Sequence, residues 1–105
     1  MVHRLMVQYG PPTDPAEFDR HYRQVHAGLA AAIPGLVRFT TGRPRAMGGQ
    51  QAPYLVAELD FESAEAMAAG MDSDAGRAAG ADVATFATGG ATMASFDVDE
   101  VSPAG

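Results

Sequence analysis

The chain has 105 residues, a length that suits one domain built around a single hydrophobic core. Its formal net charge is −6, every Lys/Arg position is an arginine, and cysteine is absent. This composition excludes disulfides, thiolate metal sites and cysteine nucleophiles, and it argues against nucleic-acid binding, which depends on basic contacts to phosphates. The apolar run Leu5–Val7 is far too short for a signal peptide or a membrane span, so we expect a cytoplasmic protein without membrane association.

The first predicted element is a strand over residues 2–9. Apolar and polar side chains alternate along this segment, and Gly10-Pro11-Pro12 then interrupts the chain.

A long amphipathic helix is predicted between Asp14 and Gly35. Asp14 suits the N-cap, Pro15 falls at the first helical position, and Glu17 completes a capping box. Pro34-Gly35 ends the helix, because proline cannot continue it and glycine accepts a left-handed conformation.

Two histidines flank the apolar stripe of this helix. With about 100° per residue, the stripe consists of Phe18, Tyr22, Val25, Leu29 and Ile33. His26 lies about 60° from the centre of the stripe and His21 about 80° from it on the opposite flank. We therefore expect His21 at the surface, and His26 beside Tyr22, four residues earlier on the same side of the helix.

The remaining elements follow from alternation, caps and breakers. Strands are predicted over residues 36–41 and 54–61, separated by a loop rich in glycine, proline and glutamine. Ser63 caps a helix over 64–71, and Asp72-Ser73-Asp74 introduces a further helical stretch over 75–86. Gly89-Gly90 precedes a last strand over 91–98. We expect one domain over residues 1–98 and a tail over 99–105 that is frayed from Ser102 onward.

The predicted order is β-α-β-β-α-β, an α+β fold of the ferredoxin-like type, in which helices cover one face of a four-stranded antiparallel sheet. The other face mixes apolar and polar side chains: Met6, Gln8, Arg38, Thr40, Tyr54, Val56 and Phe96. We expect a homodimer in which these faces pack together and enclose a small cavity.

Several segments resemble the EthD-like family. Residues 18–30 (FDRHYRQVHAGLA) are similar to its Y-x-x-x-H-x-P-L-A signature, with Gly28 where proline is usual. Residues 33–36, 54–61, 63–67 and 81–87 also match the family, in the same order. Taken together, the likeness covers roughly residues 2–98. The resemblance implies a dimeric α+β barrel, whose relatives include muconolactone isomerases, polyketide cyclases, decarboxylases and cofactor-free monooxygenases.

The resemblance also implies a site at His26 and Tyr22, the recurrent polar pair of EthD-like proteins. His26 would be the general acid/base and Tyr22 a hydrogen-bond donor to a ligand oxygen. A structural pair at the rim of the core is the alternative. Barrel relatives sometimes use a histidine on the first strand, but we expect His3, close to the N-terminus, to be solvated.

Further residues are candidates for binding a hydrophobic small molecule. They are the aromatic residues Tyr9, Phe39, Tyr54 and Phe86, together with Asp82 as a partner that orients a group in the cavity. Ordinary core packing and a surface charge are the respective alternatives. We expect no cofactor and no metal site, because His21 and His26 are five residues apart, which spreads ligands around an α-helix.

Two functions stay open at this point. One is a cofactor-independent enzyme that uses acid-base chemistry on a hydrophobic carbonyl or aromatic compound, of the isomerase, cyclase, decarboxylase or monooxygenase type. The other is a binding or accessory protein that holds a hydrophobic metabolite unchanged. A dimeric domain with a purely structural role is a third reading.

Overall fold

The computed structural model describes residues 1–102, so the predicted frayed segment lies, apart from Ser102, outside the described residues. The predicted element order is confirmed. The elements are β1 His3–Tyr9, α1 Pro15–His21, the π-helical turn η1 Tyr22–His26, α2 Ala27–Ala31, β2 Leu36–Gly42, β3 Leu55–Phe61, α3 Ala64–Asp72, α4 Asp74–Phe86 and β4 Ala91–Asp97.

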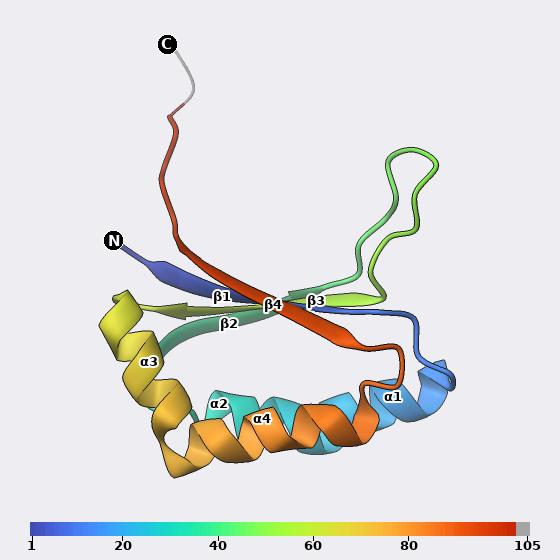
Figure 1. Cartoon of the computed structure of the whole chain (residues 1–105), viewed down its shortest axis with the longest axis horizontal. Helices are drawn as coiled ribbons and strands as arrows, with labels where there is room; N and C mark the ends of the chain where they lie inside the picture. Colours follow the sequence, from blue (N-terminus) through green and yellow to red (C-terminus); the bar gives the residue numbers. More distant parts are fainter. Residues whose placement is uncertain (103–105) are drawn as a thin grey trace.

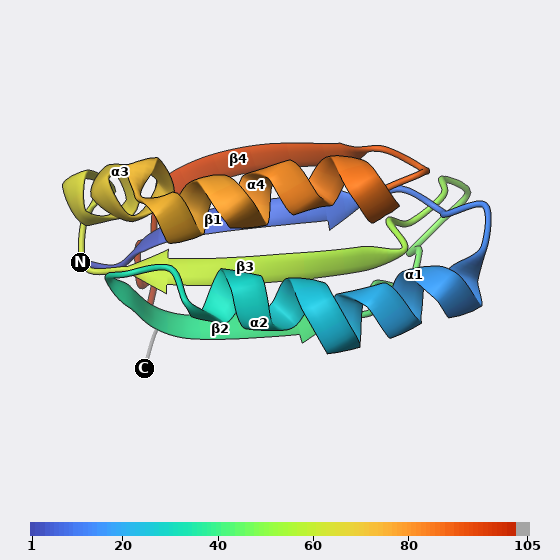
Figure 2. The ribbon, with the colours of Figure 1, turned by 90° about the horizontal axis from the view of Figure 1, so that it is seen from below.

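The four strands form one antiparallel sheet in the order β2-β3-β1-β4. All helices lie on the same side of this sheet (Figure 1). Viewed from the helical side, α1 and α2 lie over β2 and β3, and α4 lies over β1 (Figure 2). The core therefore lies between the sheet and a single layer of helices.

Alternation along the central strands places one set of side chains in this core. Buried and half-buried residues alternate along β1, and the buried side chains of β1 and β3 pack against the helices. In β2 the alternation is broken, because the pairing with β3 shifts in register between Leu36 and Arg38. Val37 is consequently 54% exposed, and Leu36 and Phe39 pack against the core instead. Strict alternation along this strand would place Val37 and Phe39 on one face, and the register shift separates them.

The predicted long helix is divided into three segments. Its N-cap is confirmed, since the Asp14 carboxylate accepts a hydrogen bond from the Glu17 backbone N–H at 3.2 Å. The Glu17 carboxylate, however, pairs with Arg20 and does not close a capping box. In η1 the N–H of Ala27 donates to the carbonyl of Tyr22, the i→i+5 bond of a π-turn. Helical structure then ends at Ala31, before Pro34 and Gly35.

The other helix starts agree with the predicted caps. The Ser63 side chain accepts from the Ala66 N–H, and the Ser73 side chain accepts from the Gly76 N–H. Each hydroxyl satisfies a backbone donor of the first helical turn that has no partner within the helix.

The free face of the sheet carries a charge network among both apolar and polar neighbours. Arg4 binds Asp60 through two hydrogen bonds of 2.7 and 3.0 Å, and it also approaches Glu58 at 3.5 Å. The Arg4 guanidinium keeps the pKa of Asp60 below its usual value, although burial opposes the shift. The register of the strands places six further side chains on this face: Met6, Gln8, Arg38, Thr40, Val56 and Phe96.

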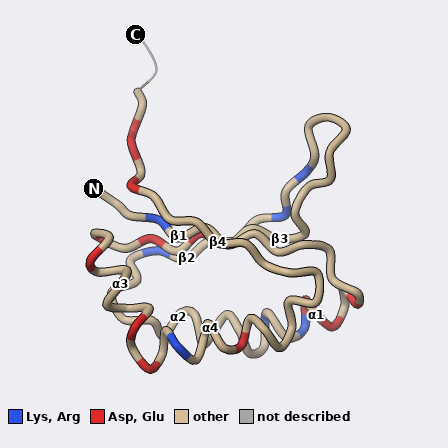
Figure 3. Tube along the Cα trace, in the orientation of Figure 1, with Lys and Arg blue, Asp and Glu red and all other residues tan. Residues whose placement is uncertain are grey.

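The loop between β2 and β3 and the segment after β4 both project on this free side (Figure 1). Within residues 1–102, acidic and basic positions are interspersed along the chain, without a continuous basic stripe (Figure 3).

Candidate functional site

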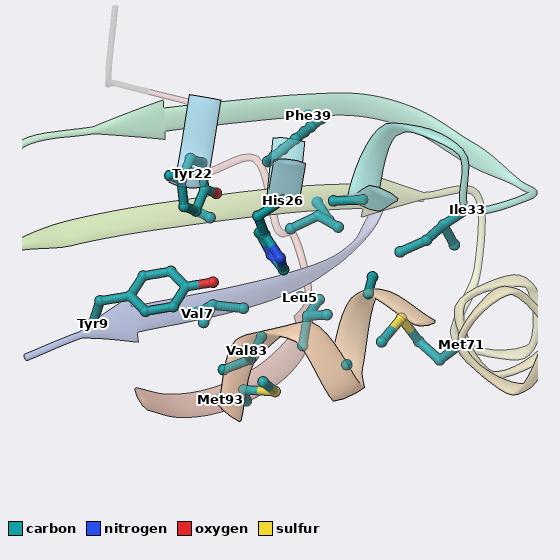
Figure 4. Close-up of a pocket in the computed structure, with 15 residues that line it drawn as sticks. Leu5, Val7, Tyr9, Tyr22, His26, Ile33, Phe39, Met71, Val83 and Met93 are labelled. Carbon is teal, nitrogen blue, oxygen red and sulfur yellow. The ribbon is translucent and has the colours of Figure 1, made fainter. Parts of the chain in front are cut away.

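A cavity lies between the sheet and the helices of the single chain, and Figure 4 shows the side chains around it. Its empty volume is about 390 Å³ when its opening is included, and a water-sized sphere reaches only about 30 Å³ of it. The lining residues are Leu5, Val7, Tyr9, Tyr22, His26, Ala30, Ile33, Phe39, Ala57, Leu59, Met71, Ala79, Gly80, Val83 and Met93. The predicted cavity between the sheets of two subunits stays a prediction; the cavity in this chain lies on the opposite face of the sheet.

Three polar side chains line this otherwise apolar cavity: Tyr9 from β1, and Tyr22 and His26 from the two ends of η1. The Tyr22 hydroxyl is buried and makes no hydrogen bond within the described residues. An unsatisfied buried polar group costs about 1–3 kcal/mol, which a ligand oxygen would recover.

Both cavity phenols are neutral donors at physiological pH. Burial raises the pKa of Tyr22 to about 12. Burial also raises the pKa of Tyr9, and the neighbouring Tyr22 and Asp82 add to that shift. Each hydroxyl therefore keeps its proton and can donate it in a hydrogen bond.

Asp82 sets the protonation pattern of His26. His26 Nδ1 lies 3.0 Å from Asp82 Oδ2. Since an ionised carboxylate only accepts, Nδ1 carries the proton, and Nε2 keeps its lone pair in the neutral ring. Burial lowers the pKa of His26, and the hydrogen bond and charge of Asp82 offset part of that shift. His26 is thus a neutral base at pH 7.

His21 shares the same carboxylate. Its Nε2 lies 2.9 and 3.0 Å from the two oxygens of Asp82, and the Thr85 hydroxyl donates to Oδ1 at 3.1 Å. Burial alone would raise the pKa of Asp82, but the hydrogen bonds from His21, His26 and Thr85 outweigh it and lower that pKa. Asp82 is therefore ionised and holds both imidazoles.

The π-turn explains why the surface position predicted for His21 was wrong. In an α-helix, residues five apart point about 140° away from each other. The hydrogen bonds of η1 join residues five apart and bring them to one side. His21 and His26 consequently meet at one carboxylate, and the His21 side chain retains only 21% exposure.

The other predicted ligand-binding residues divide into two groups. Tyr9 and Phe39 line the cavity, whereas Asp82, Phe86 and Tyr54 do not. Asp82 acts behind His26, as the predicted orienting partner would. Phe86 packs beneath both imidazoles, with ring centroids 4.8 Å from His26 and 5.0 Å from His21.

Tyr54 lies away from both the cavity and the free sheet face on which it was predicted. Its hydroxyl donates to Asp19 at 3.0 Å, its ring packs edge-on against Phe18, and the Arg43 guanidinium lies over it. The ring of Tyr54 thus joins the start of β3 to α1 and to the loop after β2.

His3 is buried, contrary to the predicted solvated position. It retains 8% exposure, and its Nδ1 lies 2.7 Å from Asp97 Oδ1 on β4. It does not line the cavity, and it forms a second histidine–carboxylate pair elsewhere in the sheet.

Residues 1–102 lack two further features. No cluster of three or more histidine, aspartate or glutamate side chains is arranged to hold a metal ion. None of the helices in this part of the chain combines the length and apolar character needed to cross a membrane.

Comparisons with known proteins agree with the fold. The chain is 39% identical over 103 residues to an uncharacterised 11.0 kDa protein of Rhodococcus erythropolis from the thcB-thcC intergenic region, covering 97% of this chain and all of that one. The crystal structure of an EthD family protein from Bacillus halodurans is 31% identical, with a TM-score of 0.88, over 94% of this chain and 100% of the other.

More distant structures share the fold alone. A dimeric ferredoxin-like protein of unknown function from Thermobifida fusca is 19% identical, with a TM-score of 0.71 and coverage of 93% and 92%. SnoaB, a cofactor-independent oxygenase from Streptomyces nogalater, is 18% identical, with a TM-score of 0.70 and coverage of 98% of both chains. The EthD domain model matches residues 10–90, and this chain therefore belongs to the EthD family.

Proposed function

We propose that this protein is a cofactor-independent enzyme that removes a proton from a hydrophobic carbonyl or aromatic compound. The observation that carries the proposal is the convergence of a neutral imidazole, held by Asp82, and the unpartnered Tyr22 hydroxyl on one apolar cavity. His26 Nε2 would accept the proton, and Tyr22 would donate to the oxygen on which negative charge develops.

Asp82 supports this role in two ways. It fixes the His26 tautomer whose lone pair is at Nε2, and its charge stabilises the imidazolium that forms when the base takes up a proton. The same geometry suits isomerisation, cyclisation or decarboxylation. SnoaB, which has the same fold, is a cofactor-independent oxygenase, so we include among the possible reactions an oxygenation that begins with proton removal.

The small water-accessible volume limits the ligand. An aromatic compound would have to displace side chains, and Met71 and Met93 are the flexible ones in the lining. Met93 is 52% exposed on the edge strand β4, which makes this edge the favoured entrance in our proposal.

Hydrogen–deuterium exchange tests the proton abstraction without knowledge of the final product. A panel of small enolisable ketones and lactones is incubated with the protein in D₂O, and loss of the α-proton signal is followed by NMR. We expect accelerated exchange for a subset of the panel, and His26→Gln should slow it by roughly 10²–10⁴-fold, the usual contribution of a general base.

His3→Gln is the matched control, because His3 is also buried and bound to an aspartate but lies outside the cavity. It should leave the exchange rate unchanged. Exchange that survives in His26→Gln would refute the assignment of the base. Ligand binding without exchange for any panel member would favour the alternative function, a protein that holds a hydrophobic metabolite unchanged.

We also propose a homodimer through the free faces of the sheets. Met47, Phe96 and Val101 are exposed large apolar side chains, and a second copy on this face would cover apolar surface of this kind. The ferredoxin-like structure from Thermobifida fusca is described as dimeric, which supports a dimer. Native mass spectrometry of freshly purified protein should give twice the 10.9 kDa chain mass and would also reveal a retained metabolite; a monomer at micromolar concentration would refute the dimer.

A further inference from the structure

The cavity contains a second phenol that the proposed function does not use. Tyr9 is 1% exposed and lines the cavity from β1. The Tyr9 and Tyr22 rings meet nearly at right angles, at 85°, with their centroids 5.8 Å apart. Figure 4 shows the Tyr9 hydroxyl directed from β1 toward the region where the Tyr22 and His26 side chains lie.

The charges around the cavity restrict its ligand. No arginine, aspartate or glutamate of residues 1–102 lines it, and the carboxylate of Asp82 lies behind His26. A ligand that enters as a carboxylate or phosphate would meet only neutral donors and would lose its hydration in an apolar space. The net charge of −6 adds a repulsive field.

We propose that the Tyr9 and Tyr22 hydroxyls together bind one oxygen atom of an uncharged ligand that carries a transferable proton. This inference rests on the proposed function and adds a second donor and a ligand class to it. The proton moves to His26 Nε2, the electron pair of the broken bond stays on the ligand, and the oxygen becomes anionic. Two O–H groups then donate to that oxygen, and the imidazolium balances its charge.

This arrangement favours charge that is created inside the cavity over charge that is carried into it. Proton transfer within the complex leaves the total charge of the site unchanged, whereas binding of a preformed anion adds a negative charge beside Asp82. The ligand class is therefore a neutral enolisable carbonyl compound or a phenol, and carboxylates are rejected.

The chain offers a matched set of variants, because it has three tyrosines and only two of them line the cavity. The probe is para-nitrophenol, titrated calorimetrically at a pH where it is largely uncharged, with para-nitrobenzoate as an anion of similar shape. Tyr9→Phe and Tyr22→Phe should each weaken nitrophenol binding roughly tenfold, the usual effect of one strong hydrogen bond. Tyr54→Phe, which removes only the bond to Asp19, should bind as the wild type does.

We expect nitrobenzoate to bind at least roughly tenfold more weakly than nitrophenol. Wild-type affinity in Tyr9→Phe, equal or tighter binding of nitrobenzoate, or no binding of nitrophenol would each overturn the inference. The melting temperature of each variant identifies any that is misfolded, and in that case Tyr9→Met and Tyr22→Met replace the phenylalanine variants.

The binding experiment can fail without the proposed function failing, and the reverse is also true. Binding that depends on both phenols, combined with deuterium exchange that is unaffected by His26→Gln, would retain the oxygen site and refute the enzymatic base. Exchange that requires His26, combined with unchanged binding by Tyr9→Phe, would do the reverse.

Discussion

Replacement of Asp82 by asparagine should reverse the tautomer of His26. In the native site the carboxylate accepts from His26 Nδ1 at 3.0 Å and from His21 Nε2 at 2.9 Å. The amide of asparagine offers one acceptor oxygen and one donor nitrogen, so it can satisfy only one imidazole N–H. If its oxygen stays with His21, its NH₂ faces His26 Nδ1, which then accepts, and the proton moves to Nε2.

Two magnitudes follow from this geometry. One hydrogen bond to a charged acceptor is lost, which should lower the free energy of unfolding by about 2 kcal/mol. A base whose lone pair points away from the cavity should slow deuterium exchange by roughly 10²–10⁴-fold. The pKa of His26 should also fall further, because Asp82 is the group that raises it against the effect of burial.

Long-range ¹H–¹⁵N correlation spectra of the imidazoles report which nitrogen carries the proton, and urea unfolding gives the stability. Asp72→Asn is the control, since Asp72 forms only an exposed ion pair with Arg77 and should change neither measurement. An unprotonated Nε2 in Asp82→Asn, or a stability equal to that of the wild type, would refute the reasoning about the shared carboxylate.

Three further predictions concern stability. Gly28→Ala should raise the free energy of unfolding by roughly 0.5–1 kcal/mol, because Gly28 lies within α2 and an added Cβ would meet no atom within 4 Å; a loss of stability in urea melts would contradict this. Gly70→Ala should instead destabilise the fold by roughly 1–3 kcal/mol, since its Cβ would lie 2.5 Å from the carbonyl oxygen of Pro34, and an unchanged midpoint would show that α3 can shift. Wild-type stability should fall as the pH drops below about 6.5, because the folded state lowers the pKa of His26 and the unfolded chain takes up this proton first. The His26→Gln protein should lose less stability than the wild type between pH 7.5 and pH 5.5, and an equal loss would assign the pH dependence to other groups.

Local patterns in the sequence determined most of the fold. Alternation along residues 2–9 and 54–61 defined the central strands. The helix starts followed from their N-caps, since each of these side chains accepts a hydrogen bond from the first helical turn: Asp14, Ser63 and Ser73. These features are local, because a capping bond or an alternating strand involves residues only a few positions apart. The Tyr22 and His26 pair was likewise found from helical spacing and family likeness, and both residues line the cavity.

Tertiary structure decided the chemistry of that pair. Whether residues 22–26 form an α- or a π-turn depends on one shift in hydrogen bonding, which sequence periodicity does not register. The partner that orients His26 lies 56 positions away on α4, and the same carboxylate draws in His21. His3 similarly becomes buried through a partner 94 positions away on β4. The sequence by itself therefore determined the order of the elements and the position of His26 beside Tyr22. The packing of α4 against η1 decided the tautomer and the basicity of His26, and it also drew in His21, because these properties depend on contacts between segments far apart in the chain.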